Sequence, residues 1–137
     1  MDAPANSQSP PLLYMLHCGL QGVVLGKVCE RLGLDIQIRQ FREEHFFAYQ
    51  MRANRQGPDL ILVRGHFIGL VNELDLNRNI PYLVVSSKEK YGVGQKHFLH
   101  ANLGYDTRST LPLYKAIAGR LKEMISSKTE SRPAESR

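Results

Sequence analysis

The chain has 137 residues, enough for one domain with a full core and too few for two comfortable ones. Hydrophobic residues make up 42% and charged residues 23%, which is ordinary for a soluble globular protein. The net charge is +5, but the basic residues form no long run and mix with acids, so the sequence does not favour nucleic-acid binding. No apolar run approaches the ~20 residues of a membrane-spanning helix, and the N-terminus lacks signal-peptide features, so we expect a cytoplasmic protein without membrane contact.

Both ends of the sequence have the composition of tails. Residues 1–11 are small, polar and proline-rich, and residues 126–137 are polar with mixed charge. Such segments cannot bury enough apolar surface to offset the entropy of ordering, so we expect both to be disordered. Residues 12–125 then form one domain, because no linker or internal repeat divides them.

The first half of this domain alternates predicted strands and helices. Residues 12–16 are apolar throughout and predict an interior strand, and apolar spacing from Leu20 predicts a helix that stops at Gly33. Residues 35–39 alternate polar and apolar, as an edge strand does. A helix over 42–55 follows, and its expected packing residues are Phe46, Phe47 and Met51.

The central strand of the predicted sheet covers residues 59–63. Four consecutive aliphatic residues there indicate a strand buried on both faces, and Gly65 ends it in a turn. Residues 68–76 predict the next helix, and residues 81–86 a second buried strand. Open α/β sheets place their chemistry at the carboxyl ends of the strands, and the residue at that point of the central strand is Arg64.

The last part of the domain has a weaker pattern before its final helix. Glycines interrupt residues 88–104, for which we predict a short helix over 95–102 and a weak fifth strand near 103–107. The final helix is clear, since Thr110 can cap it and an apolar stripe continues to Ile125. The whole is a (βα)5 alternation, which predicts an α/β fold with a doubly wound parallel sheet between two layers of helices.

Three stretches resemble the receiver domain of bacterial two-component response regulators. They are PDLILV before the central turn, IPYLVVSS at the fourth strand, and the segment GYDTRS. The resemblance covers residues 12–125 and implies a flavodoxin-like three-layer sandwich with the strand order 2-1-3-4-5.

The positions that carry receiver chemistry are changed in this sequence. Receivers carry an acidic pair that holds magnesium where this sequence has His17 and Cys18. They carry the phosphorylated aspartate where this sequence has Arg64. Ser86 matches the hydroxyl residue that ends strand 4, and Arg108 is the counterpart of the lysine that ends strand 5. A guanidinium is always charged and is not a nucleophile, and without acids the site would repel a magnesium ion. The chain is therefore identified as a degenerate receiver, or pseudo-receiver, without catalysis, cofactor or metal.

The basic residues at the strand ends support an alternative, a sensor of a small anionic metabolite or nucleotide. Basic side chains and free helix-start amides are groups that bind phosphate. The candidate residues for this site are His17, Arg39, Arg64, Ser86 and Arg108.

Cysteine and histidine chemistry is a third possibility that the sequence supports less well. Cys18 precedes a glycine-containing turn, as in phosphocysteine phosphotransfer domains, but Val24 stands where a phosphatase loop needs arginine. Cys18 and Cys29 are otherwise expected to be reduced thiols that form no disulfide. The five histidines form no tight cluster of the about four ligands that zinc needs.

The first hypothesis for function is a signalling module that acts by protein–protein interaction. Residues 126–137 have the composition of a tail, so we expect no output domain after residue 125 and expect the domain to act alone through its surface. The partner is another signalling or regulatory protein, or a second copy of the chain in a homodimer. The usual interaction face of receivers comprises helix 4, strand 5 and helix 5, which here implies Tyr91, Phe98 and Tyr105.

Overall fold

The computed structural model describes residues 10–16, 20–75, 78–101 and 110–135, with side chains of the last segment from Leu111 to Ser127. Within these ranges no helix is both long and apolar enough to span a bilayer.

Five parallel strands form one sheet in the order β2-β1-β3-β4-β5. The strands are β1 (Leu12–Leu16), β2 (Gln37–Phe41), β3 (Leu60–Arg64), β4 (Tyr82–Ser86) and β5 (Phe98–His100). The helices are α2 (Gly22–Arg31), α3 (Glu44–Ala53), α4 (Ile68–Leu74) and α5 (Thr110–Glu135), with 3-10 turns η1 (Gly65–Phe67) and η2 (Glu89–Gly92). This is the flavodoxin-like fold and the strand order that the sequence predicts.

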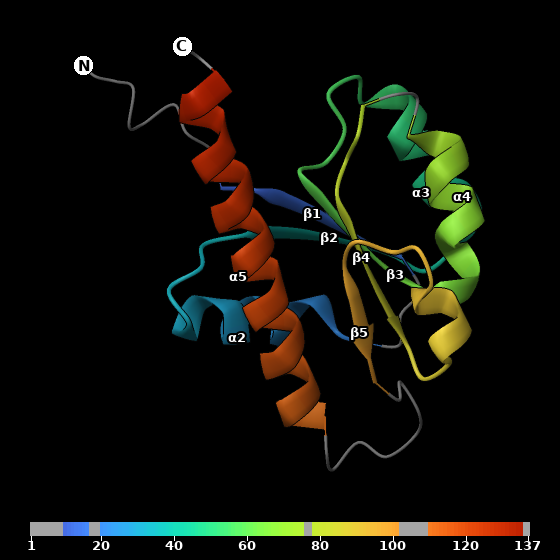
Figure 1. Cartoon of the computed structure of the whole chain (residues 1–137). Coiled ribbons are helices and arrows are strands. Elements are labelled where there is room, and N and C mark those ends of the chain that lie inside the picture. The colour runs from blue at the N-terminus through green and yellow to red at the C-terminus, as the bar shows by residue number, and fades with distance from the viewer. Residues whose placement is uncertain (1–9, 17–19, 76–77, 102–109, 136–137) are drawn as a thin grey trace.

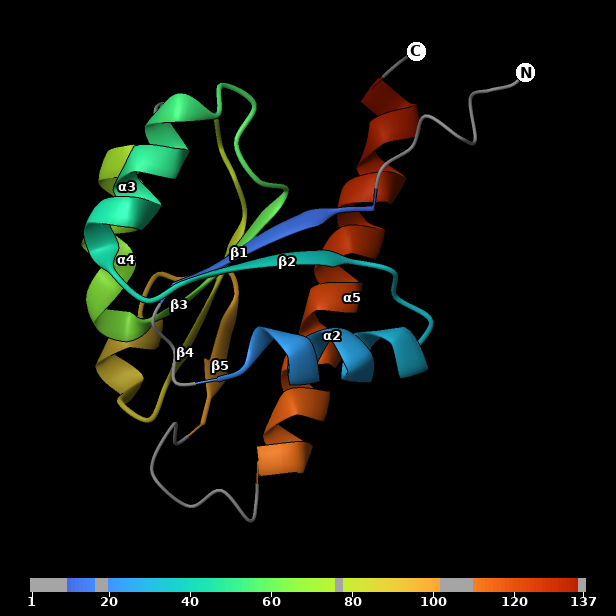
Figure 2. The ribbon, with the colours of Figure 1, turned by 180° about the vertical axis from the view of Figure 1, so that it is seen from behind.

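The sheet lies between two layers of helices. Figures 1 and 2 show α2 and α5 on one face and α3 and α4 on the other. Because successive strand residues point to opposite faces, Leu62 and Leu83 join the cluster under α2 and α5, whereas Ile61 and Val84 join the cluster under α3 and α4. The first four residues of β3 are fully buried, which explains why the strand is apolar at each position before Arg64.

The connection from β4 to β5 differs from the prediction. The helix expected over 95–102 is wrong, because Phe98–His100 is strand β5 and pairs with Val84–Ser86 of β4. The 3-10 turn η2 takes the place of a fourth crossover helix. A strand of three residues is too short to show a period of two, so only its pairing with β4 identifies it. The strand expected near 103–107 lies outside the described residues.

Helix α3 differs from the prediction in one of its three expected packing residues. Phe47 and Met51 are fully buried as expected, but Phe46 is 56% exposed, so its assignment to the core is wrong. Residues 47 and 51 are one helical turn apart and share the buried stripe, whereas residue 46 is rotated about 100° away from residue 47. The side chain of Phe46 is thus available at the surface.

The final helix is longer than the sequence indicates. Among its described side chains the buried ones end at Met124, and Ile125, which the sequence predicts as the last residue of the stripe, is partly buried; the helix continues to Glu135. Helix therefore covers most of the segment for which the sequence predicts a disordered tail.

Candidate functional site at the carboxyl edge of the sheet

Arg64 and Ser86 end neighbouring strands at the carboxyl edge of the sheet. Both side chains are half-buried, and the backbone partner of Arg64 in β4 is Val85. The alternation of β3 places Arg64 on the same face as Leu62, toward α2 and α5. The alternation of β4 places Ser86 on the face of Val84, toward α3 and α4. The two residues therefore mark the same edge but belong to opposite faces.

The ring of Tyr91 lies directly against the backbone of Gly65, the residue after Arg64. A Cβ atom on Gly65 would come within 2.3 Å of Tyr91 Cγ, so only glycine fits this buried position. The ammonium of Lys90 lies 5.1 Å from the centroid of the same ring, within range of a cation–π interaction. The protein's own aromatic side chain thus covers the end of the central strand.

The turn after β4 engages the hydroxyl of Ser86. The backbone N–H of Lys88 donates to Ser86 Oγ at 3.0 Å, which begins the turn that carries Tyr91 back to Gly65. The backbone N–H of Ala101 donates to the Ser86 carbonyl at 3.0 Å, and His100 Nε2 lies 2.9 Å from the Ser87 carbonyl. The hydroxyl and the carbonyl of Ser86 therefore both accept hydrogen bonds from the backbone of the loop at this edge.

The end of β5 brings a histidine to the carboxyl edge of the sheet. The strand ends at His100, which is an ionisable residue at this point of the edge. Arg108 lies outside the described residues, as do His17, Cys18 and Tyr105.

Arg39 does not join the edge where Arg64 lies. It is the middle residue of β2 and pairs with Tyr14 of β1, so β1 separates its strand from β3. Its guanidinium carbon lies 5.8 Å from the centroid of the Phe41 ring, on the α3 face of the sheet. The side chain is exposed, so Arg39 belongs to a different surface from Arg64.

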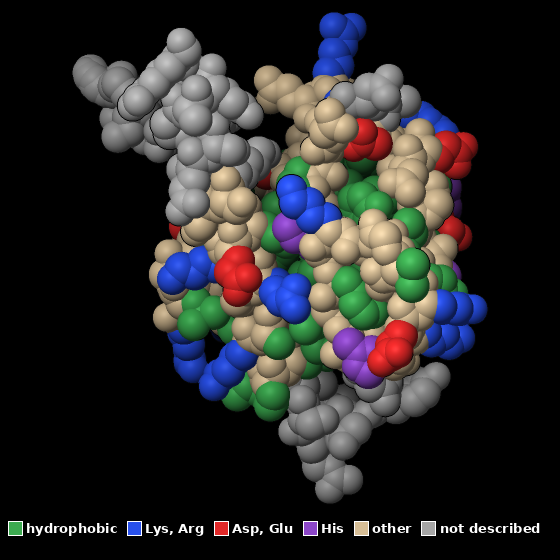
Figure 3. All heavy atoms as spheres, in the orientation of Figure 1, with side chains coloured by type: hydrophobic (Ala, Val, Ile, Leu, Met, Phe, Trp, Pro, Cys, Tyr) green, Lys and Arg blue, Asp and Glu red, His purple; other side chains and the backbone are tan. Residues whose placement is uncertain are grey.

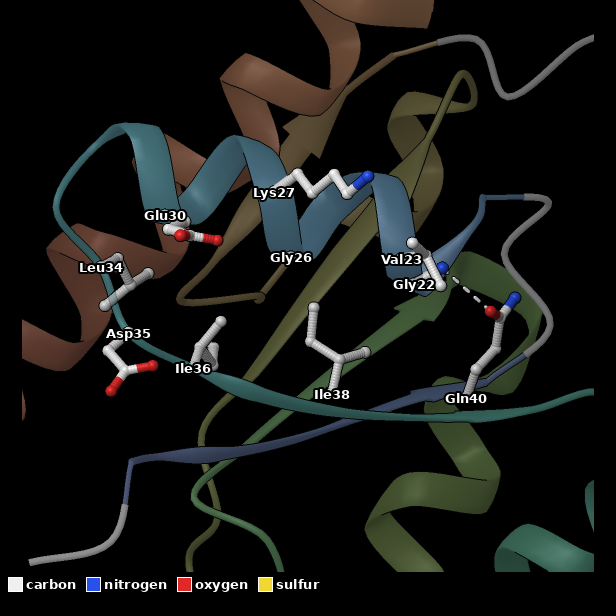
Figure 4. Close-up of a pocket in the computed structure, with 10 residues that line it drawn as sticks. All are labelled: Gly22, Val23, Gly26, Lys27, Glu30, Leu34, Asp35, Ile36, Ile38 and Gln40. Atoms are coloured by element: carbon white, nitrogen blue, oxygen red, sulfur yellow. Dashed lines mark hydrogen bonds between the residues drawn. The ribbon is translucent and has the colours of Figure 1, made fainter.

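The first amides of helix α2 already have acceptors within the protein. Gln21 N–H donates to the Tyr114 hydroxyl at 2.8 Å, and Gly22 N–H donates to Gln40 Oε1 at 2.9 Å (Figure 4). The Gln40 amide in turn donates to the Leu20 carbonyl at 2.6 Å. The sensor hypothesis expects free amides at the start of α2, but those of Gln21 and Gly22 are already bonded within the protein.

The structure reveals three residues that the sequence analysis missed at this edge. They are Gly65, whose only sequence signal was that of a turn, together with Lys88 and His100. Lys88 and His100 are both exposed. Lys88 follows Ser86 by two residues in the chain, and His100 is the partner of Ser86 in the neighbouring strand β5. A correct placement of β5 would have been needed to find His100.

Two open cavities lie away from this edge. A groove of about 410 Å³ runs between α2 and β2, and Figure 4 shows Ile36 and Ile38 of its floor pointing toward Gly22 and Gly26. A cavity of about 390 Å³ lies between α4 and the segment before β5, and His97 lines it. Burial, followed by the charges of Lys96 and Arg120, lowers the pKa of His97 and favours its neutral form.

Cys29 is a core residue of α2. It is fully buried, and burial raises the pKa of its thiol to about 11 from 9.0.

The Cys29 thiol should resist iodoacetamide in the folded protein and react after unfolding, as peptide mass spectrometry can show. Because the unfolded state releases this proton first, the thiol's contribution to stability should fall as the pH rises from 9.0 to about 11. Rapid alkylation of Cys29 without unfolding would contradict this assignment.

No three histidine, cysteine, aspartate or glutamate side chains come together as a metal site among the described residues. The carboxyl ends of β3 and β4 carry Arg64, His66 and Lys88 and no carboxylate from Val63 to Ile68. A magnesium ion is held by carboxylate oxygens, and residues 63–68 at the end of β3 offer none.

Comparison with solved structures finds proteins of similar fold. It superimposes on the anti-anti-sigma factor PhyR from Bartonella quintana with a TM-score of 0.63, at 12% identity, over 95% of this chain and 53% of that one. The chain has a receiver-like fold. The phosphorylated cyanobacterial phytochrome response regulator RcpA also matches, with a TM-score of 0.49 and 14% identity over 80% of this chain and 91% of that one.

The receiver-like chain spans about half the length of PhyR, because 53% of PhyR is covered. No protein-family profile matches the sequence, and no curated protein matches it significantly. At 12% identity the similarity to PhyR establishes the fold alone.

Proposed function

We propose that the chain is a receiver-like signalling module that does not transfer phosphoryl groups and that acts by binding another protein. The observation that carries this proposal is Arg64 at the carboxyl end of the central strand β3, where the receiver resemblance implies a phosphorylated aspartate. An aspartyl phosphate needs a carboxylate nucleophile and a cation to neutralise the phosphoryl charge. A guanidinium supplies no nucleophile and repels the cation.

The packing of Tyr91 supports the same proposal. Its ring rests on Gly65 and covers the residue that follows Arg64, which leaves less room for a phosphoryl group and its metal at this edge. Restoring the acid alone would leave this cover in place, together with His17 and Cys18 in place of the acidic pair. We therefore expect Arg64→Asp alone not to restore phosphorylation.

The surface that we propose for the partner is the segment that joins β4 to β5. Tyr91 and Phe98 are half-buried and pack on the core under α3 and α4, so they anchor this segment. Val93, between Gly92 and Gly94, is 80% exposed and is the apolar group of the segment that a partner can reach. Figure 3 shows hydrophobic side chains on this face between scattered charges of both signs, which suits a protein partner.

The class of partner that fits is a regulatory protein in the cytoplasm. PhyR is described as an anti-anti-sigma factor, and RcpA as a response regulator. Both descriptions denote regulation, which favours a partner of that kind for this chain. We propose no contact with membrane, and the mixed charges in Figure 3 give no reason to propose nucleic acid.

The variant Val93→Asp tests this surface without touching the core. We expect it to remove the proteins that co-purify with the tagged chain from its own cells, while the melting temperature stays unchanged. The matched control is Val23→Asp, a second exposed valine (73%) on α2, which should retain those proteins. Retention by both variants would contradict the proposed surface.

The sensor alternative keeps Arg64, Lys88 and His100 as its basic groups but loses Arg39 and the first amides of α2. Calorimetric heat with phosphate or nucleotides at low salt, abolished by Arg64→Ala, would favour it over protein binding. Phosphotransfer through Cys18 stays a prediction and would require a stable phosphothioester at that residue.

A further inference from the structure

The outer edge of the sheet beside α2 and α3 is formed by β2. This strand pairs with β1 on one side, and no described strand pairs with its other side. It has five residues and contains neither proline nor lysine, which commonly prevent edge strands from pairing. In Figure 2, β2 runs along the rim of the sheet.

The backbone of β2 presents its free groups at alternate residues. Gln37 N–H donates to the Pro11 carbonyl at 2.8 Å, so the backbone of Gln37 faces β1. Because this direction alternates along a strand, the N–H and C=O groups of Ile38 and Gln40 face away from β1. These groups can accept a further strand without disturbing the sheet.

We propose that this edge binds a second copy of the chain, with the two β2 strands antiparallel across a two-fold axis at Ile38. An axis at Arg39 would oppose two guanidiniums, which disfavours that register. With the axis at Ile38, the two Ile38 residues form a hydrogen-bonded pair, and Gln37 faces the second copy's Arg39. This proposal goes beyond the signalling function and does not rest on it.

Charge complementarity is what selects a second copy as the occupant. Continued past the start of β2, this register brings Asp35 of one copy, which also lines the groove beside α2, opposite Phe41 of the other. The guanidinium of Arg39 already lies 5.8 Å from the Phe41 ring centroid, so it is positioned to meet that carboxylate. Asp35 and Arg39 are both exposed. Because the interface has two-fold symmetry, the ion pair between Asp35 of one copy and Arg39 of the other occurs twice.

Apolar groups flank this edge on both faces of the sheet. The groove of Figure 4 lies on the α2 side, with Ile36 and Ile38 in its floor. On the other side, Phe46 of α3 is exposed and lines a cavity with Arg39 and Phe41. A second copy would cover apolar surface that the single chain leaves in contact with water.

The test is the molar mass of the full chain across a concentration series, measured by light scattering after size exclusion. We expect a dimer that Arg39→Asp and Asp35→Arg each weaken about tenfold or more, because symmetry applies each change twice. The double variant Arg39→Asp/Asp35→Arg exchanges the two charges and should recover the dimer. The control Lys115→Asp makes the same charge change on an exposed residue of α5 and should leave the dimer intact.

A second readout follows the backbone itself. The amides of Ile38 and Gln40 should exchange hydrogen more slowly as the protein concentration rises, whereas those of Gln37 and Arg39 should not respond. A monomer at every concentration would overturn the proposal. So would a dimer that Lys115→Asp disrupts and Arg39→Asp does not, because that result assigns the interface to α5.

Discussion

Replacing Gly65 with alanine is expected to lower the free energy of unfolding by about 2–3 kcal/mol. The new methyl group would lie 2.3 Å from Tyr91 Cγ and 2.7 Å from Tyr91 Cβ, so the root of the side chain must move and a rotation of the ring alone does not suffice. Chemical denaturation followed by circular dichroism measures this loss.

Two further variants show whether Tyr91 causes the loss. Gly69→Ala adds the same methyl group within α4, where nothing lies within 4 Å, and should raise stability by up to about 1 kcal/mol. In the Gly65→Ala background, Tyr91→Ala should cost much less than it does alone, because the clash disappears with the ring. Equal costs in both backgrounds would show that Tyr91 does not rest on Gly65.

The variant Arg78→Ala should be destabilised by roughly 2–4 kcal/mol, because a charged donor of several hydrogen bonds is lost. Arg78 lies in the loop before β4 and donates to four backbone carbonyls, the most distant of which is that of Arg55 at 3.5 Å. Its three shortest contacts are to the carbonyls of Asn54 at 2.7 Å, Leu74 at 2.8 Å and Asp75 at 2.9 Å. The side chain thereby joins the carboxyl ends of α3 and α4.

The control for Arg78 is Arg52→Ala, which removes an exposed arginine from the last turn of α3 and should change stability by less than about 0.5 kcal/mol. Arg78→Lys should recover little, because a lysine cannot reproduce the planar fork of donors. Urea denaturation of the three variants measures these differences. A lysine variant as stable as the wild type would mean that charge, and not the carbonyl contacts, matters at residue 78.

The buried strands could be predicted from sequence because their burial leaves a direct signature. The segments at β1, β3 and β4 are runs of aliphatic residues between turn signals, and the fold confirms all three. The alternation that places β2 at an edge is confirmed as well. The resemblance to receivers supplied the strand order, which no local pattern contains.

The remaining features depend on contacts between distant residues. β5 exists because Phe98–His100 pairs with β4, and the contact between Tyr91 and Gly65 joins a turn to a strand end far away in the sequence. Arg39 was expected beside Arg64, but register with β1 places it in the middle of β2. The sequence shows which residues are basic but not which strand positions they occupy.

The measurement that tests the central claim most directly is phosphorylation of the full chain by labelled acetyl phosphate with Mg²⁺. The receiver resemblance implies an acceptor aspartate at the position of Arg64, and no carboxylate lies between Val63 and Ile68, so we predict no label on the wild type or on Arg64→Asp. A response-regulator receiver in the same assay serves as the positive control. An acid-stable, base-labile acyl phosphate on the wild-type chain would contradict the account.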